Sequence, residues 1–311
     1  MLHIRWPEGK SFAFTIFDDT DRQVPGNYEK VYDFLRDKGL RTTKSVWPLR
    51  GTEESVHAGG SCEDPDYLKH MLELQRSGFE IGYHGSTYHS VQRPEILRGL
   101  DLFRDLFGHD PRTMANHTGQ AESIYWGPAR ITGPQRWAYN LLTLGRYRKS
   151  FSGHCRESPY FWGDLCRERI EYVRNFITSD INTLKVFPAM PYHDPERPYV
   201  RQWYCSSEGP EVNSFLETIS EENQDRLEAE GGACIMYTHF AFGFQDKSGE
   251  LHPRFRHLID RLSKKNGWFV PVGTLLDYIR SQRGDQVITP AERSRMERQW
   301  IMHKIRVRGT T

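Results

Sequence analysis

The sequence has 311 residues, of which 37% are hydrophobic and 13% are aromatic, and its formal net charge is +1. This composition excludes a disordered chain, and basic residues spread evenly along it argue against a nucleic-acid-binding protein. At about 150 residues per domain the length allows two domains, although a single α/β barrel commonly takes about 200–250 residues.

The sequence shows no sign of export or membrane insertion. The first apolar stretch, Phe12 to Phe17, is short and runs straight into Asp18 and Asp19, unlike the apolar region of a secretory signal. No run approaches the roughly 18 apolar residues that span a bilayer. The five cysteines include no C-x-x-C motif. We therefore expect free thiols, no zinc–cysteine site and a cytoplasmic protein.

The first part of the chain alternates strand and helix patterns. Strands are expected at 11–17, 42–47, 79–83 and 112–116, and helices begin at Asn27, Pro65 and Pro94. The strand centres are roughly 30 to 36 residues apart, which is the length of a βα unit. The spacing predicts a parallel sheet, and it leaves open whether that sheet closes into a barrel.

The middle of the chain, from about 118 to 208, is rich in aromatic, Pro, Gly and Arg residues and is expected to form an irregular insertion. Only weak strand patterns occur there, at 175–178 and 183–187. Order returns with a helix at 212–228, a strand at 233–238, a helix at 253–264, a strand at 268–272 and a helix at 273–281. We therefore expect one barrel domain over 1–284 that carries this insertion.

A basic segment ends the chain at 285–311. Thr289–Glu292 is a capping-box pattern that starts a helix. The basic residues are Arg293, Arg295, Arg298, Lys304, Arg306 and Arg308. We expect a solvated terminal helix that packs through Met296, Trp300 and Ile301. The alternative is a peripheral contact with an acidic membrane surface or partner.

Polar side chains of metal-binding or acid–base type follow four of the expected strands. They are Asp18 and Asp19 with Asp21 close behind, His84 with His89 five residues on, Asn116 with His117, and His239. In parallel α/β folds, catalytic groups gather at the C-terminal ends of strands. The joint pattern therefore predicts one functional site.

Two neutral imidazoles and one carboxylate suit zinc or a similar divalent ion and leave a position open for water. The metal lowers the pKa of that water, and a second carboxylate beside it can accept the proton as general base. A histidine on the far side of the substrate can protonate a leaving amine. These residue types predict metal-dependent hydrolysis.

Four segments resemble motifs of the polysaccharide deacetylase family, the NodB-homology domain of carbohydrate esterase family 4. They are Thr15–Asp19, Glu80–His89, Met236–His239 and Trp268–Val272 with the following leucines. The resemblance covers roughly 10–117 and 231–280 and does not cover the middle. It implies a distorted (β/α)7 barrel that removes N- or O-acetyl groups from sugars.

The resemblance also implies a role for each matching residue. Asp18 would be the general base, and His239 would be the general acid. Asp19, His84 and His89 would hold the metal, for which Zn2+ is the expected ion. The implied setting is carbohydrate metabolism, such as the synthesis of an exopolysaccharide or lipopolysaccharide.

The sequence departs from the family pattern at two places. The histidines are five residues apart instead of the usual four, which turns the second by about 140° on an ideal helix. His117 is the alternative third ligand. The arginine and proline of the family's third motif are absent, and Asn116 or His117 is expected to line the site there. From the middle segment, Trp162, His193 and Asp194 are expected to reach the substrate.

We therefore expect a metal-dependent hydrolase that removes an acetyl or other acyl group from an amino sugar or polysaccharide precursor. One alternative keeps the metal but cleaves another C–N amide bond. Another is a catalytically inactive carbohydrate-binding or assembly protein on the same barrel, which the altered motifs favour. The aspartate pair argues against it, since a binding module needs no base beside a metal.

Overall fold

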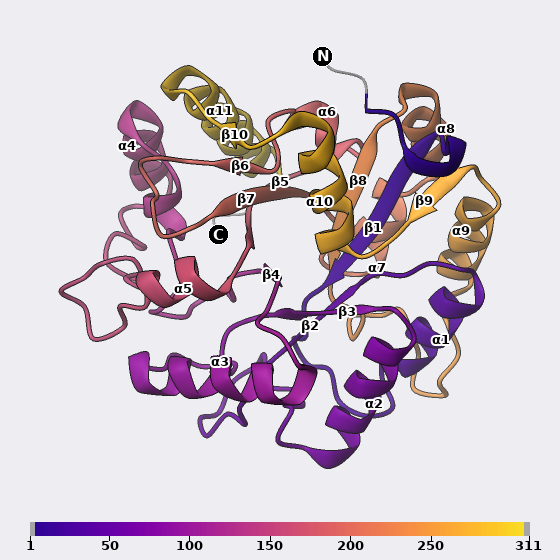
Figure 1. Ribbon diagram of the computed structural model, residues 1–311, viewed down its shortest axis with the longest axis horizontal. Coiled ribbons are helices and arrows are strands. Elements are labelled where there is room, and N and C mark those ends of the chain that lie inside the picture. Colours follow the sequence, from indigo (N-terminus) through magenta and orange to yellow (C-terminus); the bar gives the residue numbers. More distant parts are fainter. Residues whose placement is uncertain (1–3, 308–311) are drawn as a thin grey trace.

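The computed structural model describes residues 4–307, and these form one sheet of ten strands (Figure 1). The strands are β1 Phe12–Asp18, β2 Thr43–Val46, β3 Glu80–Tyr83, β4 Thr113–Met114, β5 Tyr172–Thr178, β6 Tyr192–His193, β7 Gln202–Glu208, β8 Ala233–Thr238, β9 Gly267–Phe269 and β10 Gln286–Val287. β1 is buried at every position. Its near-continuous apolar sequence is typical of a strand covered on both faces.

Seven of the strands close into a ring. Neighbours in the order β7-β5-β4-β3-β2-β1-β8 are parallel, and β8 pairs in turn with β7. The ring is uneven, because β1 and β8 pair from Ala13 to Asp18 whereas β3 and β4 pair only through Tyr83 and Met114. The strands β6, β9 and β10 lie outside it. This is the distorted (β/α)7 barrel expected from the sequence.

Helices surround the ring (Figure 1). They are α1 Glu29–Asp37, α2 Pro65–Arg76, α3 Arg93–Phe107, α4 Gly133–Leu142, α5 Gly163–Arg169, α6 Thr183–Val186, α7 Val212–Thr218, α8 Glu221–Glu230, α9 Pro253–Ser263, α10 Val272–Arg283 and α11 Pro290–Val307, with short 3-10 turns η1 Pro7–Gly9 and η2 Gly127–Arg130. The single helix expected at 212–228 is two helices, α7 and α8. Within residues 4–307, none of the helices has the length and apolar character needed to cross a bilayer.

The middle of the chain differs from the expected insertion, because it supplies β5 and β7 to the ring. The sequence of β7, Gln202–Glu208, has few apolar residues, yet all but its last position are buried. Some of its buried polar groups find partners inside the fold, whereas Gln202 Oε1 and Ser206 Oγ have none within residues 4–307. Ser207 Oγ, for example, lies 2.7 Å from the hydroxyl of Thr183. The segment expected as a strand at 183–187 is the helix α6, which Asn182 caps through Lys185 N at 3.1 Å.

The C-terminal helix α11 packs against the barrel. Its expected apolar contacts form, and Trp300 is fully buried. Arg293 is also buried, and its Nη2 lies 2.5 Å from Asp194. Arg308 lies outside the described residues. Buried ion pairs and aromatic packing therefore make α11 part of the barrel domain, in place of the solvated tail expected from its basic sequence.

All five cysteines are free, as expected. Glu122, in the loop that follows β4, is a buried ionisable side chain. Its Oε1 accepts a hydrogen bond from Val91 N at 3.2 Å, whereas its Oε2 has no partner within residues 4–307. Burial raises the pKa of Glu122 to about 8. The carboxyl group therefore gives up its proton much less readily in the folded chain than in the unfolded one.

We predict that Glu122 makes the protein less stable as the pH rises. Its pKa goes from 4.5 in the unfolded chain to about 8 in the folded chain, so the loss should develop across that interval and be absent below it. Glu122→Gln should remove this dependence and gain on the order of a few kcal/mol over the wild type between about pH 5 and about pH 9. Denaturant unfolding at the two pH values measures the difference. Parallel pH dependences of variant and wild type would contradict the assignment.

Candidate metal and catalytic site

A pocket of about 310 Å³ opens at the C-terminal ends of the ring strands. That volume is at the lower end of ligand-binding pockets. Its charged and metal-binding lining residues come from segments far apart in the sequence. They are Asp19, Asp21, His84, His117, Arg130, Arg174, Glu208, His239 and Lys304. The closed ring brings them together, because parallel strands end at the same edge of the sheet.

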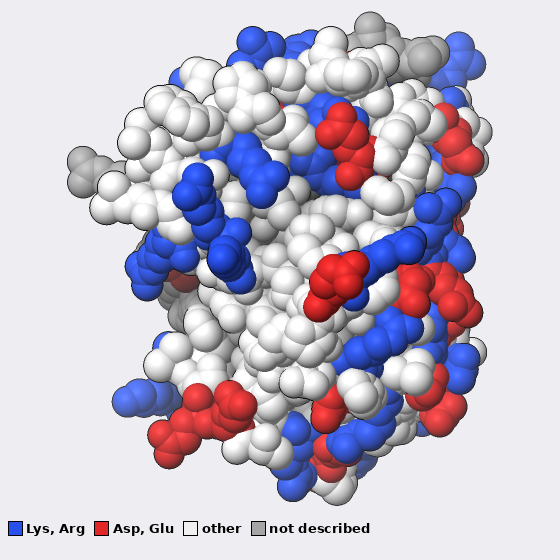
Figure 2. Space-filling model, turned by 90° about the vertical axis from the view of Figure 1, so that its left-hand side faces the viewer, with Lys and Arg blue, Asp and Glu red and all other residues white. Residues whose placement is uncertain are grey.

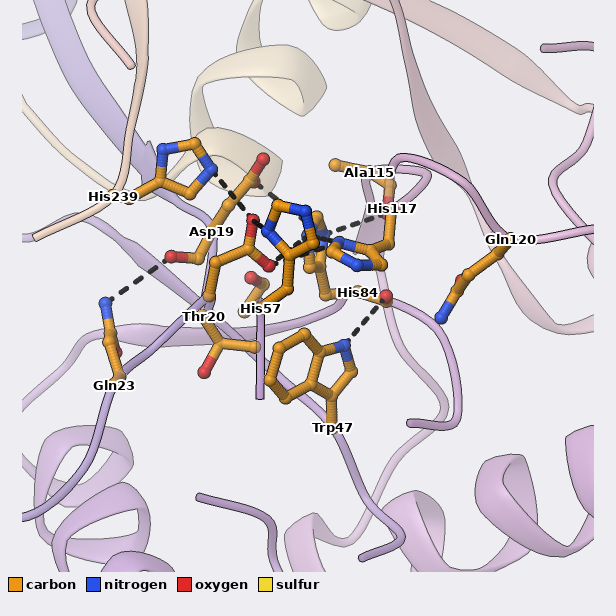
Figure 3. Close-up of polar contacts among 12 residues, drawn as sticks. Asp19, Thr20, Gln23, Trp47, His57, His84, Ala115, His117, Gln120 and His239 are labelled. Atoms are coloured by element: carbon orange, nitrogen blue, oxygen red, sulfur yellow. Dashed lines mark hydrogen bonds and ion pairs between the residues drawn. The ribbon is translucent and has the colours of Figure 1, made fainter. Parts of the chain in front are cut away.

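Asp21, in the loop after β1, is surrounded by imidazole rings, and Figure 3 shows His57, His84, His117 and His239 converging on one place. Its Oδ1 lies 3.1 Å from His117 Nδ1 and 3.5 Å from His84 Nε2. Its Oδ2 lies 3.1 Å from His239 Nε2 and 3.8 Å from His57 Nδ1. Burial opposes ionisation of Asp21, but the rings of His117, His239 and His84 hold its pKa well below the usual range.

The donor chemistry of this group fits a divalent metal. His84 Nδ1 lies 3.1 Å from the carbonyl oxygen of Ala115, so that nitrogen carries the proton and Nε2 presents its lone pair to Asp21. Asp21 Oδ1 is buried and makes no hydrogen bond of good geometry within residues 4–307. The ligand atoms of Asp21, His84 and His117 all lie within 4.8 Å of one another. A cation among them would satisfy all three.

Asp19 lies beside this group and is held by Arg174 of β5. The two side chains form a bidentate pair, with Nη1–Oδ1 at 3.0 Å and Nη2–Oδ2 at 2.6 Å. The guanidinium carbon also lies 4.2 Å from the centre of the Tyr237 ring. Burial lowers the pKa of Arg174, but Asp19 outweighs burial and raises it. Arg174 therefore fixes the orientation of the Asp19 carboxylate. No arginine was expected at this place, because the arginine of the family's third motif is absent from the sequence.

His239 follows β8 and contacts Oδ2 of Asp21, whereas His84 and His117 lie nearest its Oδ1. Its Nδ1 lies 2.6 Å from the carbonyl oxygen of Pro210. Burial lowers the pKa of His239, but the hydrogen bond and charge of Asp21 outweigh burial and raise it. The structure thus favours an imidazolium, which is the form that can donate a proton.

Asp18 does not line the pocket. Its fully buried carboxylate accepts hydrogen bonds from Tyr32 Oη at 2.6 Å, Gln23 Nε2 at 2.7 Å and Phe240 N at 2.8 Å. Burial raises the pKa of Asp18, while Lys44, with its Nζ at 3.9 Å, acts in the opposite direction. Asp18, which was expected to be the general base, therefore ties together the loops that follow β1 and β8, whereas its neighbour Asp19 lines the pocket.

His89 lies outside the metal group. Its Nε2 accepts a hydrogen bond from Thr52 N at 3.0 Å. The chain from His84 to His89 forms a loop of bends in which Gly85 has a φ of 98°, and no helical turn follows β3. On such a loop, a residue five positions after His84 does not come back beside it, so the ring of His89 lies away from that of His84. The second imidazole of the Asp21–His84–His117 group is instead His117, which the end of β4 brings within 3.3 Å of His84.

The remaining expected substrate contacts have structural partners. Asn116 lines the pocket, but its amide bonds to the backbone N and O of Ile124 at 2.8 and 3.1 Å. Trp162 donates to a carbonyl of the loop after β4 at 2.7 Å. His193 contacts backbone carbonyls before β7, and Asp194 pairs with two buried arginines. The last three do not line the pocket.

The cationic pocket residues that the sequence did not assign to the site are Arg130, Arg174 and Lys304. Arg174 left a weak signal, because it sits inside an otherwise buried strand, and a buried guanidinium needs a carboxylate partner. Arg130 and Lys304 left none, because they lie outside the ring strands, on η2 and α11. Asp21 was visible, but only as one of three nearby aspartates.

No family model and no curated protein sequence matches the chain. Solved structures similar in fold include a putative polysaccharide deacetylase from Mycobacterium smegmatis, with a TM-score of 0.49 and 11% identity over 92% of this chain and 96% of that one. Puue allantoinase gives 0.47 and 13% over 90% and 94%. The peptidoglycan deacetylase PdaC from Bacillus subtilis gives 0.40 and 14% over 95% and 99%. The fold of this chain is established by its own strand order.

We predict that a metal ion is held by Asp21, His84 and His117. Asp21→Asn, His84→Ala and His117→Ala should each lose most of the bound metal, because each removes one of three ligands. His89→Ala is the matched control and should keep it. Elemental analysis after dialysis against zinc, together with circular dichroism to confirm folding, makes the comparison. Full metal content in His117→Ala with loss in His89→Ala would contradict this ligand set.

Proposed function

We propose that the protein is a metal-dependent hydrolase, with zinc as the expected ion, that removes an acetyl group from an amino sugar or a polysaccharide precursor. The observation that carries the proposal is the placement of three separate devices around one pocket. They are the Asp21–His84–His117 group, the arginine-oriented carboxylate of Asp19 and the imidazole of His239. A pocket of about 310 Å³ suits a small precursor better than a long polymer.

Each device has a chemical task in the hydrolysis of an amide. A bound divalent ion supplies Lewis acidity, which polarises the acyl carbonyl and acidifies water. Asp19, kept in one orientation by Arg174, accepts the proton of the attacking water. His239 donates a proton to the amine that leaves. Asp18 does not touch the substrate in this scheme and acts by holding the two loops in place.

The same devices can hydrolyse another C–N amide bond, since none of them is specific for a sugar. An inactive binding protein is less well supported, because a bidentate arginine beside a carboxylate and a proton-donating histidine are unnecessary for binding alone. Acetate release from a panel of N-acetylated amino sugars, with simple linear amides in parallel, tests the proposal. Turnover of the amides alone would select the alternative.

The two neighbouring aspartates should behave differently when changed to asparagine. Asp19→Asn should keep its fold and its metal and lose on the order of 10²–10⁴ in kcat, the usual range for a positioned general base. Asp18→Asn places an amide N–H₂ among three donors and should destabilise the protein by about 1–3 kcal/mol.

Turnover, metal content and unfolding free energy are measured on both variants. Asp18 and Asp19 are neighbours in the sequence and undergo the same substitution, so each variant is the control for the other. A larger loss of kcat in Asp18→Asn than in Asp19→Asn, at full stability, would exchange the two roles.

His239 should matter most for substrates with a poor leaving group. His239→Ala should lower kcat for N-acetyl substrates far more than it changes KM, because the proton is needed only in the transition state. Aryl acetate esters, whose leaving groups need little protonation, should be affected least. Steady-state kinetics with one amide and one aryl ester make the test. Equal losses for both would assign His239 a structural or binding role.

A further inference from the structure

The pocket has a cationic side that the proposed reaction does not use. Arg130, at the end of η2, and Lys304, on α11, line it together with Glu208. The carboxylate of Glu208 lies with its Oε2 3.0 Å from His303 Nε2, and its charge opposes the lowering of the pKa of Lys304. Arg174, the third cation in the lining, is bound to Asp19. Arg130 and Lys304 therefore add positive charge to the pocket lining beyond the cation that Asp19 binds.

Arg130 is the more informative of the two. Its side chain is 2% exposed, and its guanidinium carbon lies 3.5 Å from the ring centre of Trp126 and 4.9 Å from that of Trp300. Within residues 4–307 no carboxylate forms an ion pair with it, and its Nε and Nη2 have no hydrogen-bond partner. Indole rings over a guanidinium cover its faces and leave the N–H groups at its edge free to bind.

A buried guanidinium without hydrogen bonds is unfavourable, so a ligand that satisfies it gains affinity. Burial lowers the pKa of Arg130 to about 9 and that of Lys304 to about 8, and the charge of Arg130 adds to the effect on Lys304. Both groups are still mainly cationic at neutral pH. An anion in the pocket would relieve their mutual repulsion.

We propose that the substrate carries an anionic substituent, a carboxylate or a phosphate, that binds to Arg130 and Lys304 while its acyl group lies at the metal and Asp19. The inference rests on the proposed function for the rest of the substrate. A planar guanidinium offers two parallel N–H bonds to either kind of anion. The pocket would thereby select an acidic or phosphorylated amino sugar over its neutral parent.

Three probes that share one sugar test this selection: N-acetylglucosamine, its 1-phosphate and its uronic acid. Titration calorimetry on the zinc-loaded protein gives each Kd without requiring turnover. Lys304→Met removes one charge at nearly constant shape, and Arg130→Gln and Arg130→Lys probe the guanidinium. Arg298→Gln, an exposed arginine on the same helix and outside the pocket lining, is the control.

At least one anionic probe should bind about tenfold or more tightly than the neutral sugar, the usual effect of a hydrogen bond to a charged group. Lys304→Met should lose about that factor for the anionic probe only, and Arg298→Gln should lose nothing. Preference for the phosphate or for the uronate identifies the anion. Equal binding of all three probes, no binding of either anionic probe at millimolar concentration, or an equal loss for neutral and anionic probes in Lys304→Met would overturn the inference.

The outcome is separable from that of the proposed function. Selective anion binding without acetate release from any of the probes would leave the cationic subsite in place and reject the deacetylase. Acetate release that is as fast from the neutral sugar as from the anionic ones would support the deacetylase and reject the cationic subsite.

A second surface of the molecule, outside the pocket, has an unusual composition that does not depend on the proposed reaction. The helix α4 and the turn after it expose four large apolar side chains, Trp137 at 69%, Leu141 at 60%, Leu142 at 54% and Leu144 at 91%. The neighbouring helix α11 packs on α4 and exposes Met302 and Ile305. An apolar patch of this kind on one face marks an interaction site.

The charge around this patch has one sign. Residues 123–156 contain no Asp or Glu, and Arg136, Arg146, Arg148 and Lys149 are all exposed. None of these four forms an ion pair with a carboxylate in the part of the chain that the structure describes. Figure 2, which looks at the side of the molecule where α4 lies, shows Lys and Arg side chains beside a broad uncharged surface.

We infer that this face docks on a bilayer that contains anionic lipids. Exposed Trp and Leu side chains on one side of a helix, with Arg and Lys around them, are the composition of helices that lie in the membrane interface. The basic rim complements anionic headgroups, to which each cation adds attraction. The membrane contact considered for the C-terminal segment thus falls mainly on α4, because α11 buries several of its own polar residues.

Sedimentation with vesicles tests the docking. The wild type should bind vesicles of phosphatidylglycerol and phosphatidylcholine, bind pure phosphatidylcholine weakly, and lose binding as salt rises. A Trp137→Ser, Leu144→Ser double variant should lose most binding. Val56→Ser, at an exposed valine elsewhere, should keep it.

Failure of the wild type to bind anionic vesicles, or unchanged binding by the double variant, would overturn the inference. So would a dimer in solution that the same double variant abolishes, because the patch would then be an interface between two copies of the chain. Light scattering on both proteins in the absence of vesicles detects that case.

Discussion

Three carboxylates, Asp18, Asp19 and Asp21, are buried within four residues at the end of β1, and the mouth of the barrel is organised around neutralising them. Burying a carboxylate is unfavourable unless hydrogen bonds or an opposite charge compensate for the lost water. Each of the three has its own solution. Asp18 has three donors and a nearby lysine, Asp19 has the guanidinium of β5, and Asp21 has the imidazoles of three other strand ends.

These different partners give the three identical side chains different properties. The first is saturated with donors and directed into the protein, so it has no capacity left for a substrate. The second keeps its orientation through a bidentate pair and faces the pocket. The third keeps one oxygen without a well-formed hydrogen bond, next to two imidazole nitrogens. The difference between one carboxylate that is enclosed by the protein and two that line the pocket thus follows from their surroundings and not from their chemistry.

The remaining features of the pocket lie on segments added to the ring. η2 and α11 contribute Arg130 and Lys304 to the pocket lining, and the adjacent α4 presents the apolar patch to solvent. The proposed cationic subsite and the proposed membrane-facing surface are therefore built from neighbouring segments. A phosphorylated precursor held at a membrane surface would satisfy both, although each rests on its own observations and has its own test.

The sequence by itself determined the architecture and the region of the site. Buried strands at βα spacing indicated the barrel, and the polar residues after β1, β3, β4 and β8 indicated the mouth, because these patterns are local and follow from strand and helix periodicity. It did not assign the roles within the site. It indicated His89 as the third ligand and His117 as the alternative, and the choice between them depends on whether the loop after β3 forms a helical turn.

Contacts between distant segments also explain the other differences between the expected and the observed structure. Arg174 lies 155 residues from Asp19, and only closure of the ring shows that they meet. β7 was not recognised because several of its buried positions are polar, so its burial leaves no continuous apolar pattern in the sequence. Local periodicity is encoded in neighbouring residues, whereas the pairing of buried charges is decided by contacts between strands, and those exist only once the barrel has closed.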